Sequence, residues 1–254
     1  MEKTEYAPGT PIWIDLGAPD VPKAAAFYGS LFGWTAEPAG PVEETGGYHT
    51  FTYRGRPVAG LGPAQNPGPP YWASYFAVAD ADATVARAKE LGGTCLVEPM
   101  DVMDQGRMAV LVDPTGAVFS LWQPGAHHGA QLVNEPNTWC WNELSTRDLD
   151  TAKAFYRDLF GAGLGGAPAY VELQIGGASI AGMMPMPEMV PAQVPANWLV
   201  YVAVDDCDAS VAKAQELGAT LMAGPMEVPV GRFAVLADDQ GAPFAVIKMP
   251  EASA

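Results

Sequence analysis

An internal duplication constrains the fold of this chain more than any other feature of its sequence. The segment at 13–33 reads WIDLGAPDVPKAAAFYGSLFG, and the segment at 141–161 reads WNELSTRDLDTAKAFYRDLFG. A second pair, at 72–94 and 198–220, matches WASYFAVADADATVARAKELGGT to WLVYVAVDDCDASVAKAQELGAT. Two copies of one module therefore fill most of the 254 residues, and any explanation of one half must hold for the other.

Within a module, the spacing of apolar residues alternates between the period of a strand and the period of a helix. In the first helical stretch Ala24, Phe27 and Leu31 share one face, and Gly33 stands where a helix is expected to end. Each module is thus predicted to be β-α-β-β followed by β-α-β-β, an α+β fold. The elements expected in the first module are a strand at 12–17, a helix at 23–34, a hairpin at 48–63, a strand at 72–80, a helix at 81–93 and a hairpin at 107–123.

Module boundaries follow from the repeats. The first module is expected at 1–123 and the second at 138–254, joined by a linker at 124–137 that is polar and rich in Gly and Pro. This linker carries His127 and His128, which are predicted to be a solvated pair or at most an adventitious metal site.

Charge and cysteine content exclude several classes of function. The 13 basic and 29 acidic residues give a formal net charge of −16, which disfavours nucleic acid and anionic membrane surfaces as partners. No apolar run approaches the roughly 18 residues needed to span a bilayer, and no signal peptide is recognised. The three cysteines show no CxxC spacing, so neither a disulfide framework nor a zinc knuckle is expected. We expect a soluble, cytoplasmic protein.

Several short motifs recur in both halves. Asp20, Asp82, Asp148 and Asp208 precede helices and are predicted to be N-caps. The D-x-x-G sequences that begin at Asp113 and Asp238 are predicted to be hairpin turns. Each half also contains a Gly-Arg pair, whose arginine is expected either to clamp acidic residues near a turn or to reach an anionic ligand. These two arginines are Arg107 and Arg232.

Together, W-x-D/E-L, A-x-x-F-Y-x-x-L-F-G, V-x-D-x-D-A and G-R-x-A-V-L-x-D-x-x-G-x-x-F resemble a two-module member of the vicinal oxygen chelate superfamily. That superfamily includes glyoxalase I, extradiol dioxygenases and bleomycin-binding resistance proteins, and the chain is most similar to tandem glyoxalase-like proteins of the actinobacterial "hydroxylase" type. The resemblance covers about 11–123 and 139–249. It implies paired βαβββ units whose sheets curl into open cups, with helices outside. It also implies a monomer, because the fused modules supply the pairing that single-module relatives obtain by dimerising.

The same resemblance places metal ligands on three strands of each module, and the residues found there are unsuited to the task. None of tryptophan, tyrosine, serine and alanine is an ordinary ligand for such metals, and tryptophan has no lone pair to donate. We therefore predict no metal and no cofactor. The six positions are Trp13, Tyr75 and Ser120 in the first module and Trp141, Tyr201 and Ala245 in the second.

His49 is the one histidine within a predicted strand. If Phe51 faces the helix, His49 faces it too, so we predict a satisfied buried or edge histidine. A shift of one residue in the register would instead make it a catalytic candidate.

The cup lining follows from strand parity, because residues two apart lie on one face. If Trp13 and Trp141 point into the cups, so do Asp15 and Glu143. Such an aromatic surface with a few acids suits planar ligands that carry a polar or cationic group. The alternative is that the two tryptophans simply fill the space of a metal site. The other candidate ligand-binding residues are Tyr48, Tyr75, Trp122, Tyr170, Glu172 and Tyr201.

Asp15 and Glu143 are the candidate catalytic residues. A carboxyl group beside indole rings is expected to have a raised pKa, which suits a general acid or base. The alternative is a structural acceptor for tyrosine hydroxyls or backbone groups. Their presence in both copies favours the structural role, because a catalytic residue rarely needs to be duplicated.

These observations lead to one preferred function and two alternatives. The preferred function is a metal-independent protein that holds an aromatic or polycyclic small molecule, resembling a secondary metabolite, by sequestration or with simple acid/base chemistry. The first alternative is a metal-dependent glyoxalase or dioxygenase-type enzyme with a relocated site at His49, Glu143 or Glu172. The second is a protein-interaction module whose cups are filled.

Overall fold

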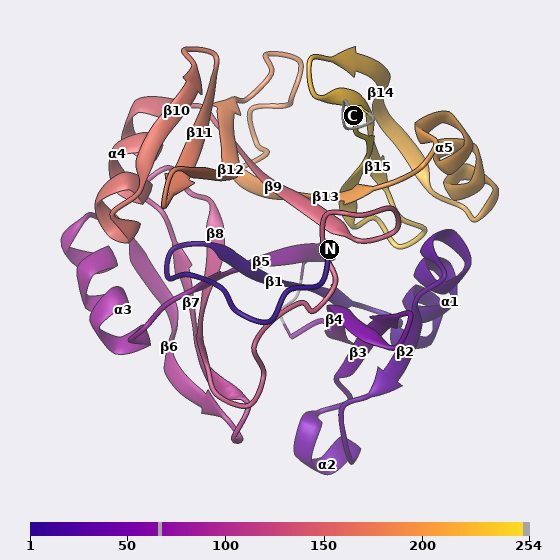
Figure 1. Cartoon of the computed structure of the whole chain (residues 1–254), viewed down its shortest axis with the longest axis horizontal. Coiled ribbons are helices and arrows are strands. Elements are labelled where there is room, and N and C mark those ends of the chain that lie inside the picture. The colour runs from indigo at the N-terminus through magenta and orange to yellow at the C-terminus, as the bar shows by residue number, and fades with distance from the viewer. Residues whose placement is uncertain (66–67, 251–254) are drawn as a thin grey trace.

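The computed structural model, which describes residues 1–65 and 68–250, contains one eight-stranded mixed sheet per module (Figure 1). The first sheet has the order β2-β3-β4-β1-β5-β8-β7-β6, and the second repeats it as β10-β11-β12-β9-β13-β16-β15-β14. This confirms two tandem α+β modules. The first module comprises β1 (Pro11–Ala18), α1 (Val21–Phe32), β2 (Thr35–Pro38), α2 (Val42–Thr45), β3 (His49–Tyr53), β4 (Arg56–Pro63), β5 (Tyr71–Ala77), α3 (Ala81–Glu90), β6 (Thr94–Val102), β7 (Gly106–Val112) and β8 (Val118–Pro124).

The second module repeats this order without a counterpart of α2. It comprises β9 (Trp139–Thr146), α4 (Leu149–Phe160), β10 (Gly163–Ala167), β11 (Tyr170–Ile175), β12 (Ala178–Pro185), β13 (Asn197–Ala203), α5 (Cys207–Glu216), β14 (Thr220–Val228), β15 (Gly231–Ala237) and β16 (Pro243–Lys248).

Each module consists of two βαβββ units, as the family resemblance implied. The β-α-β-β pattern expected from periodicity missed one strand in each unit. In the first module the missing strands are β2 and β6, which lie at the two edges of the sheet. Strand β2 has four mostly exposed residues, and pairing of β6 with β7 is interrupted by two bulges. Neither strand shows the clean alternation of a half-buried strand, which explains why periodicity missed them.

Helix starts confirm two predicted N-caps and correct two others. The side chain of Asp20 accepts a hydrogen bond from the Lys23 amide at 3.0 Å, and Asp148 caps α4 in the same way. The prediction for Asp82 and Asp208 was wrong, because the caps of α3 and α5 lie two residues earlier. They are Asp80 and Asp206.

Asp82 and Asp208 instead bind the repeated arginines. The Arg107 Nε lies 2.7 Å from Asp82, and the Arg107 Nη1 lies 2.9 Å from Asp101. Arg232 is held in the same way by Asp208 and Glu227. Both arginines therefore clamp acidic residues, which was the first of the two alternatives expected for them.

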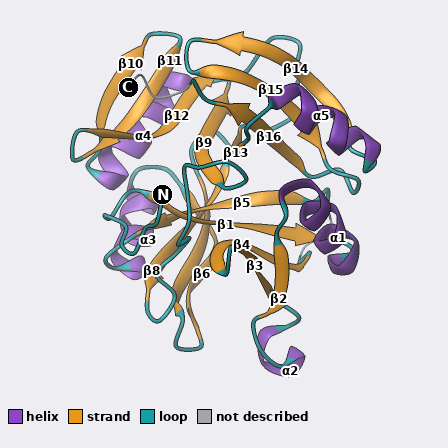
Figure 2. Ribbon diagram, turned by 45° about the vertical axis from the view of Figure 1, so that its right-hand side comes forward, coloured by secondary structure: helices purple, strands orange, loops and turns teal. Residues whose placement is uncertain are grey.

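The sheets pack against each other through their central strands, and their concave faces point outward (Figure 1). We call these concave faces the first cup and the second cup, by module. At the buried contact between the sheets, the Asn142 side-chain amide donates to the Ser74 hydroxyl at 2.6 Å. The helices pair across the modules, with α1 beside α5 and α3 beside α4 (Figure 2).

The hydrophobic cores combine residues of both modules. One core joins α1 to β16 and α5, and the other joins α3 and β8 to α4. The Tyr28 hydroxyl donates to buried Asp238 at 2.9 Å, and the Tyr156 hydroxyl donates to buried Asp113 at the same distance. The two aspartates begin the predicted turns, so each turn also anchors a helix of the other module.

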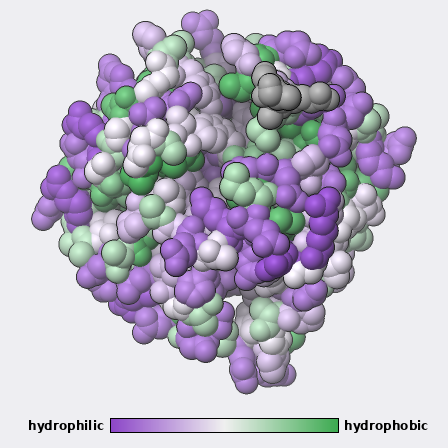
Figure 3. All heavy atoms as spheres, in the orientation of Figure 1, coloured by the Kyte–Doolittle hydropathy of each residue, from purple (hydrophilic) through white to green (hydrophobic). Residues whose placement is uncertain are grey.

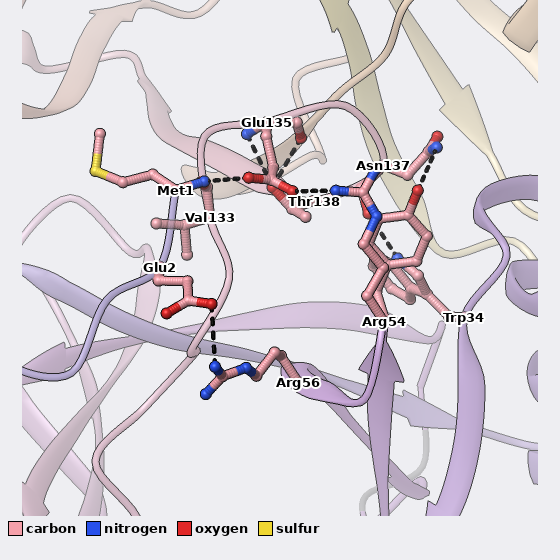
Figure 4. Close-up of polar contacts among 10 residues, drawn as sticks. Met1, Glu2, Trp34, Arg54, Arg56, Val133, Glu135, Asn137 and Thr138 are labelled. Carbon is pink, nitrogen blue, oxygen red and sulfur yellow. Dashed lines mark hydrogen bonds and ion pairs between the residues drawn. The ribbon is translucent and has the colours of Figure 1, made fainter.

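The segment at 124–137 is docked rather than free. The Ala130 amide donates to the Ile12 carbonyl at 3.0 Å, and the Tyr6 hydroxyl donates to the Ala130 carbonyl at 2.7 Å. Figure 4 shows its far end, where Glu135 pairs with Arg54 at 2.9 Å and with the terminal ammonium of Met1. Although polar in composition, this connecting segment packs three apolar side chains on the core of the first module. They are Ala130, Leu132 and Val133.

Most of the face seen in Figure 3 is hydrophilic, in keeping with the formal net charge of −16. Among the described residues, no helix is long and apolar enough to cross a membrane.

Candidate functional site

The floor of the first cup carries a hydrogen-bonded cluster of four residues that the sequence predicted to share this face. The Trp13 indole N–H donates to the Tyr48 hydroxyl at 2.9 Å. The hydroxyls of Tyr48 and Tyr75 both donate to one carboxyl oxygen of Asp15, at 3.2 and 3.1 Å. Adjacent strands bring these side chains together, because β1 pairs with β5 so that Trp13 lies opposite Tyr75.

The second cup repeats this cluster with a glutamate. The Trp141 indole N–H donates to the Tyr170 hydroxyl at 2.8 Å, and the Tyr201 hydroxyl donates to Glu143 at 2.7 Å. Strands β9 and β13 pair Trp141 with Tyr201, in the register of the first module. The structure thus brings both candidate acids, both tryptophans and four candidate tyrosines into two matched clusters.

Two glycines make room for these clusters, and the sequence analysis missed them. Gly60 pairs with Asp15, and Gly182 pairs with Glu143. A Cβ atom at Gly60 would lie 1.7 Å from the Tyr48 hydroxyl, and one at Gly182 would lie 2.1 Å from the Tyr170 hydroxyl. The signal was an Ala-Gly pair that recurs in matched strands, at 59–60 and 181–182.

Burial shifts the ionisation of both acids. It raises the pKa of Asp15 to about 6, against the opposing effect of hydrogen bonds from Tyr75 and Tyr48. The pKa of Glu143 is also raised, again mainly by burial and against hydrogen bonds from Tyr201 and Tyr170. An acid of this kind can exchange a proton near neutral pH or accept a hydrogen bond from a polar ligand group.

Register places the three metal-ligand positions implied by the family side by side in each module. Trp13 pairs with Tyr75, and Tyr75 pairs with Ser120; Tyr201 likewise lies between Trp141 and Ala245. Burial raises the pKa of both tyrosine hydroxyls above their usual value of 10. The side chains at these positions do not fit a divalent metal. Within the described part of the chain, no group of three or more His, Cys, Asp or Glu side chains is arranged for one.

Trp122 and Glu172 lie beside the clusters. The Trp122 ring is edge-on to Tyr75, with centroids 6.4 Å apart. Glu172 follows Tyr170 by two residues in β11 and accepts a hydrogen bond from the Ser179 hydroxyl at 2.5 Å. His49 is outside the cup, because it pairs with Leu61, a fully buried core residue. His49 lies on β3, between β2 and β4, so it is not at the edge of the sheet. It is half-buried, and its Nδ1 atom lies 2.9 Å from the Gly47 carbonyl oxygen, which fits the expectation of a satisfied histidine.

His127 is half-buried and not fully solvated, which corrects the prediction for this residue. Its ring lies edge-on to Trp13 and to Trp122, with centroids 4.4 and 5.5 Å away. Burial lowers the pKa of this imidazole to about 4, with a smaller effect of the same sign from His128. His128 itself is exposed, as expected. His127 is therefore part of the first cup, although it comes from the connecting segment.

Defined cavities lie elsewhere on the molecule. One of about 240 Å³ is lined by Asp101, Arg107 and Gln123 among others, and one of about 300 Å³ lies between Pro8, Ala83 and Phe160. Neither includes a residue of the aromatic clusters.

Comparison with protein families finds a match in each module. Residues 11–121 match the Glyoxalase/Bleomycin resistance protein/Dioxygenase superfamily, and residues 141–247 match the Glyoxalase-like domain. A putative glyoxylase, CFP32 of Mycobacterium tuberculosis, is 44% identical over 97% of both chains. The anthracycline biosynthesis protein DnrV of Streptomyces peucetius is 40% identical and covers 98% of this chain and 96% of its own length.

Solved structures with this fold share little sequence identity with the chain. The Mn(II)-bound glyoxalase of Novosphingobium aromaticivorans has a TM-score of 0.64 at 16% identity, covering 95% of this chain and 84% of its own. The 2,3-dioxygenase LapB of Pseudomonas sp. KL28 has a TM-score of 0.65 at 12% identity, covering 96% and 93%. At these identities the likeness concerns the fold alone.

Proposed function

We propose that this chain, which belongs to the glyoxalase/bleomycin resistance/dioxygenase superfamily, holds an aromatic or polycyclic small molecule in an aromatic-lined cup without using a metal ion. The observation that carries the proposal is the Trp–Tyr–carboxyl–Tyr cluster on each cup floor. In each cluster, the tryptophan and one tyrosine (Trp13 and Tyr75, Trp141 and Tyr201) stand at positions where the family resemblance implies metal ligands.

The chemistry of the cluster suits such a ligand. Indole and phenol rings offer flat apolar surface, and the carboxyl group of Asp15 or Glu143 can orient a hydroxyl or amine of the ligand. The relatives DnrV and DauV, named for anthracycline biosynthesis, add support, because an anthracycline is a fused-ring aromatic compound. We propose a monomer with a small molecule as its partner.

Two modes of action are compatible with this site. In the first, the protein sequesters its ligand and releases it unchanged. In the second, Asp15 or Glu143 transfers a proton to or from the ligand as a general acid or base, for which a raised pKa is suitable.

The test uses the full chain, purified without chelators or an affinity metal column. We expect well below one metal ion per chain. After treatment with a chelator, the protein should still bind 9-aminoacridine and 1,4-dihydroxyanthraquinone, measured by quenching of tryptophan fluorescence at physiological ionic strength. Mass spectrometry of the released probe separates sequestration from chemistry. One tightly held divalent ion per chain, or binding lost after chelation, would overturn the proposal.

A further inference from the structure

We propose that the two cups have different roles: the connecting segment occupies the first cup with the His127 side chain, and the second cup alone binds the ligand. This inference rests on the proposed function and deepens it. The chain would then have one ligand-binding site, although both cups carry the same cluster of side chains on their floors.

The first cup is filled by side chains of the chain itself. Trp13 is 4% exposed and Trp122 is 7% exposed, and the His127 ring packs edge-on against both. The Trp122 indole N–H also donates to the His127 carbonyl at 2.9 Å. His127 therefore contacts both large aromatic side chains of this cup: its ring packs against Trp13 and Trp122, and its carbonyl oxygen accepts a hydrogen bond from Trp122.

The docked segment holds His127 in this position. Two residues further on, the Gly129 backbone approaches Ile12 so closely that a Cβ atom there would lie 2.3 Å from the Ile12 side chain. The Gln131 amide then donates to the Pro57 carbonyl at 2.7 Å. The segment thus crosses the ends of β1 and β4, beside the cup that His127 enters.

Filling the cup with a histidine leaves a polar atom buried. The Nε2 atom of His127 is enclosed and has no hydrogen-bond partner among the described residues. Such an atom costs free energy that an apolar ring of similar size would not. The ring contacts to Trp13 and Trp122 accompany this burial, and they hold the imidazole against the aromatic side chains of the first cup.

The second cup has the same floor and is more accessible. Trp141 is partly exposed, unlike Trp13, and it packs against a small apolar cluster that includes Tyr201 and Ile247. The position of Trp122 is taken by Ile247, which pairs with Phe233 as Trp122 pairs with Met108. Among the described residues, this smaller side chain covers less of the second floor than Trp122 covers of the first.

The wall of the second cup is apolar and exposed. Phe233 and Leu199 are partly buried beside Tyr201, and Met226, which pairs with Phe233, is 41% exposed. A flat aromatic group can lie against these side chains while a hydroxyl or amine reaches Glu143. Because the floor carries this carboxyl group and the chain is acidic, neutral and cationic ligands are favoured over anions.

The first experiment compares matched wall residues by equilibrium dialysis with 9-aminoacridine. Wild type should bind one probe per chain. Phe233→Ala should weaken binding at least tenfold, whereas Met108→Ala, at the matched position of the first cup, should change the Kd by less than twofold. Two equal sites in wild type, or a larger loss for Met108→Ala than for Phe233→Ala, would overturn the inference.

The second experiment addresses His127. His127→Ala should open the first cup and raise the stoichiometry toward two, whereas His127→Phe should keep it at one and raise the Tm. A His127→Ala chain that still binds one probe with unchanged affinity would show that this residue does not close the cup. Absence of probe binding by the folded wild type would contradict the proposed function itself, whereas binding to the first cup would contradict only this inference.

Discussion

The floors of the two cups carry equivalent side chains, with Asp15 in the first and Glu143 in the second, whereas the surroundings of the floors differ. In the first cup Asp15 accepts from two tyrosines and lies near a tryptophan that is packed against His127. In the second, Glu143 has the equivalent tyrosines, but Trp141 is partly exposed. We infer that the side chains shared by both cups are required by the fold. The side chains found in only one cup reflect a specific role of that cup.

Loss of the floor tryptophans should separate the cups most clearly. We expect Trp13→Ala to lower the free energy of unfolding by about 3–5 kcal/mol, because the ring is buried and the His127 ring packs edge-on against it. Trp141→Ala should cost about 1–2 kcal/mol, because its ring is already partly in contact with water. Urea unfolding measures both. Equal losses would remove the distinction between a closed and an open cup.

The acids should show a smaller and pH-dependent difference. The pKa of Asp15 is about 6 in the folded chain against 3.8 in the unfolded chain, so its contribution to stability is present below pH 4 and lost as pH rises toward 6. Asp15→Asn stays neutral and retains an acceptor for the tyrosines. It should be more stable than wild type by about 1–3 kcal/mol at pH 8 and equal to it at pH 3.5.

Glu143→Gln is the matched control for that measurement. It should give a gain of the same sign and smaller size, because Glu143 lies beside a more accessible tryptophan. An Asp15→Asn chain that is less stable at pH 8 would show that the ionised carboxylate is a structural acceptor.

Replacement of His127 should give the smallest change in the free energy of unfolding at pH 7. The pKa of His127 is about 4 when folded against 6.5 when unfolded, so its contribution is present above pH 6.5 and lost as pH falls toward 4. His127→Phe removes this loss and the unpartnered nitrogen, and should gain about 1 kcal/mol at pH 7. Chemical denaturation at pH 5 and pH 7 measures the stability difference between His127→Phe and wild type. This difference should be larger at pH 5. A smaller difference at pH 5 would contradict the burial of a neutral imidazole.

The sequence predicted the cup floors because their geometry follows from a local rule. Strand residues two apart share a face, so a duplicated Trp-x-Asp/Glu places indole and carboxyl group together whatever the rest of the chain does. The tyrosines follow from the same parity. The glycines opposite the acids could have been predicted from their repetition, because only a residue without a Cβ atom fits there.

The remaining features depend on contacts between distant parts of the chain. His127 lies in a segment without periodicity, and its burial results from packing against Trp13 and Trp122, which no local pattern indicates. The edge strands β2 and β6 take their structure from their neighbours. The bond from Tyr28 to Asp238 spans 210 positions, so a turn motif alone could not predict its second role.

That bond and its counterpart from Tyr156 to Asp113 have an evolutionary consequence. Each of the two large hydrophobic cores is encoded partly in one copy of the repeat and partly in the other, so a change in the core of one copy must be accommodated by the other. Each concave face is built from the strands of one copy. The duplication thus ties the interiors of the two copies to a common history while leaving each cup free to diverge by its own mutations.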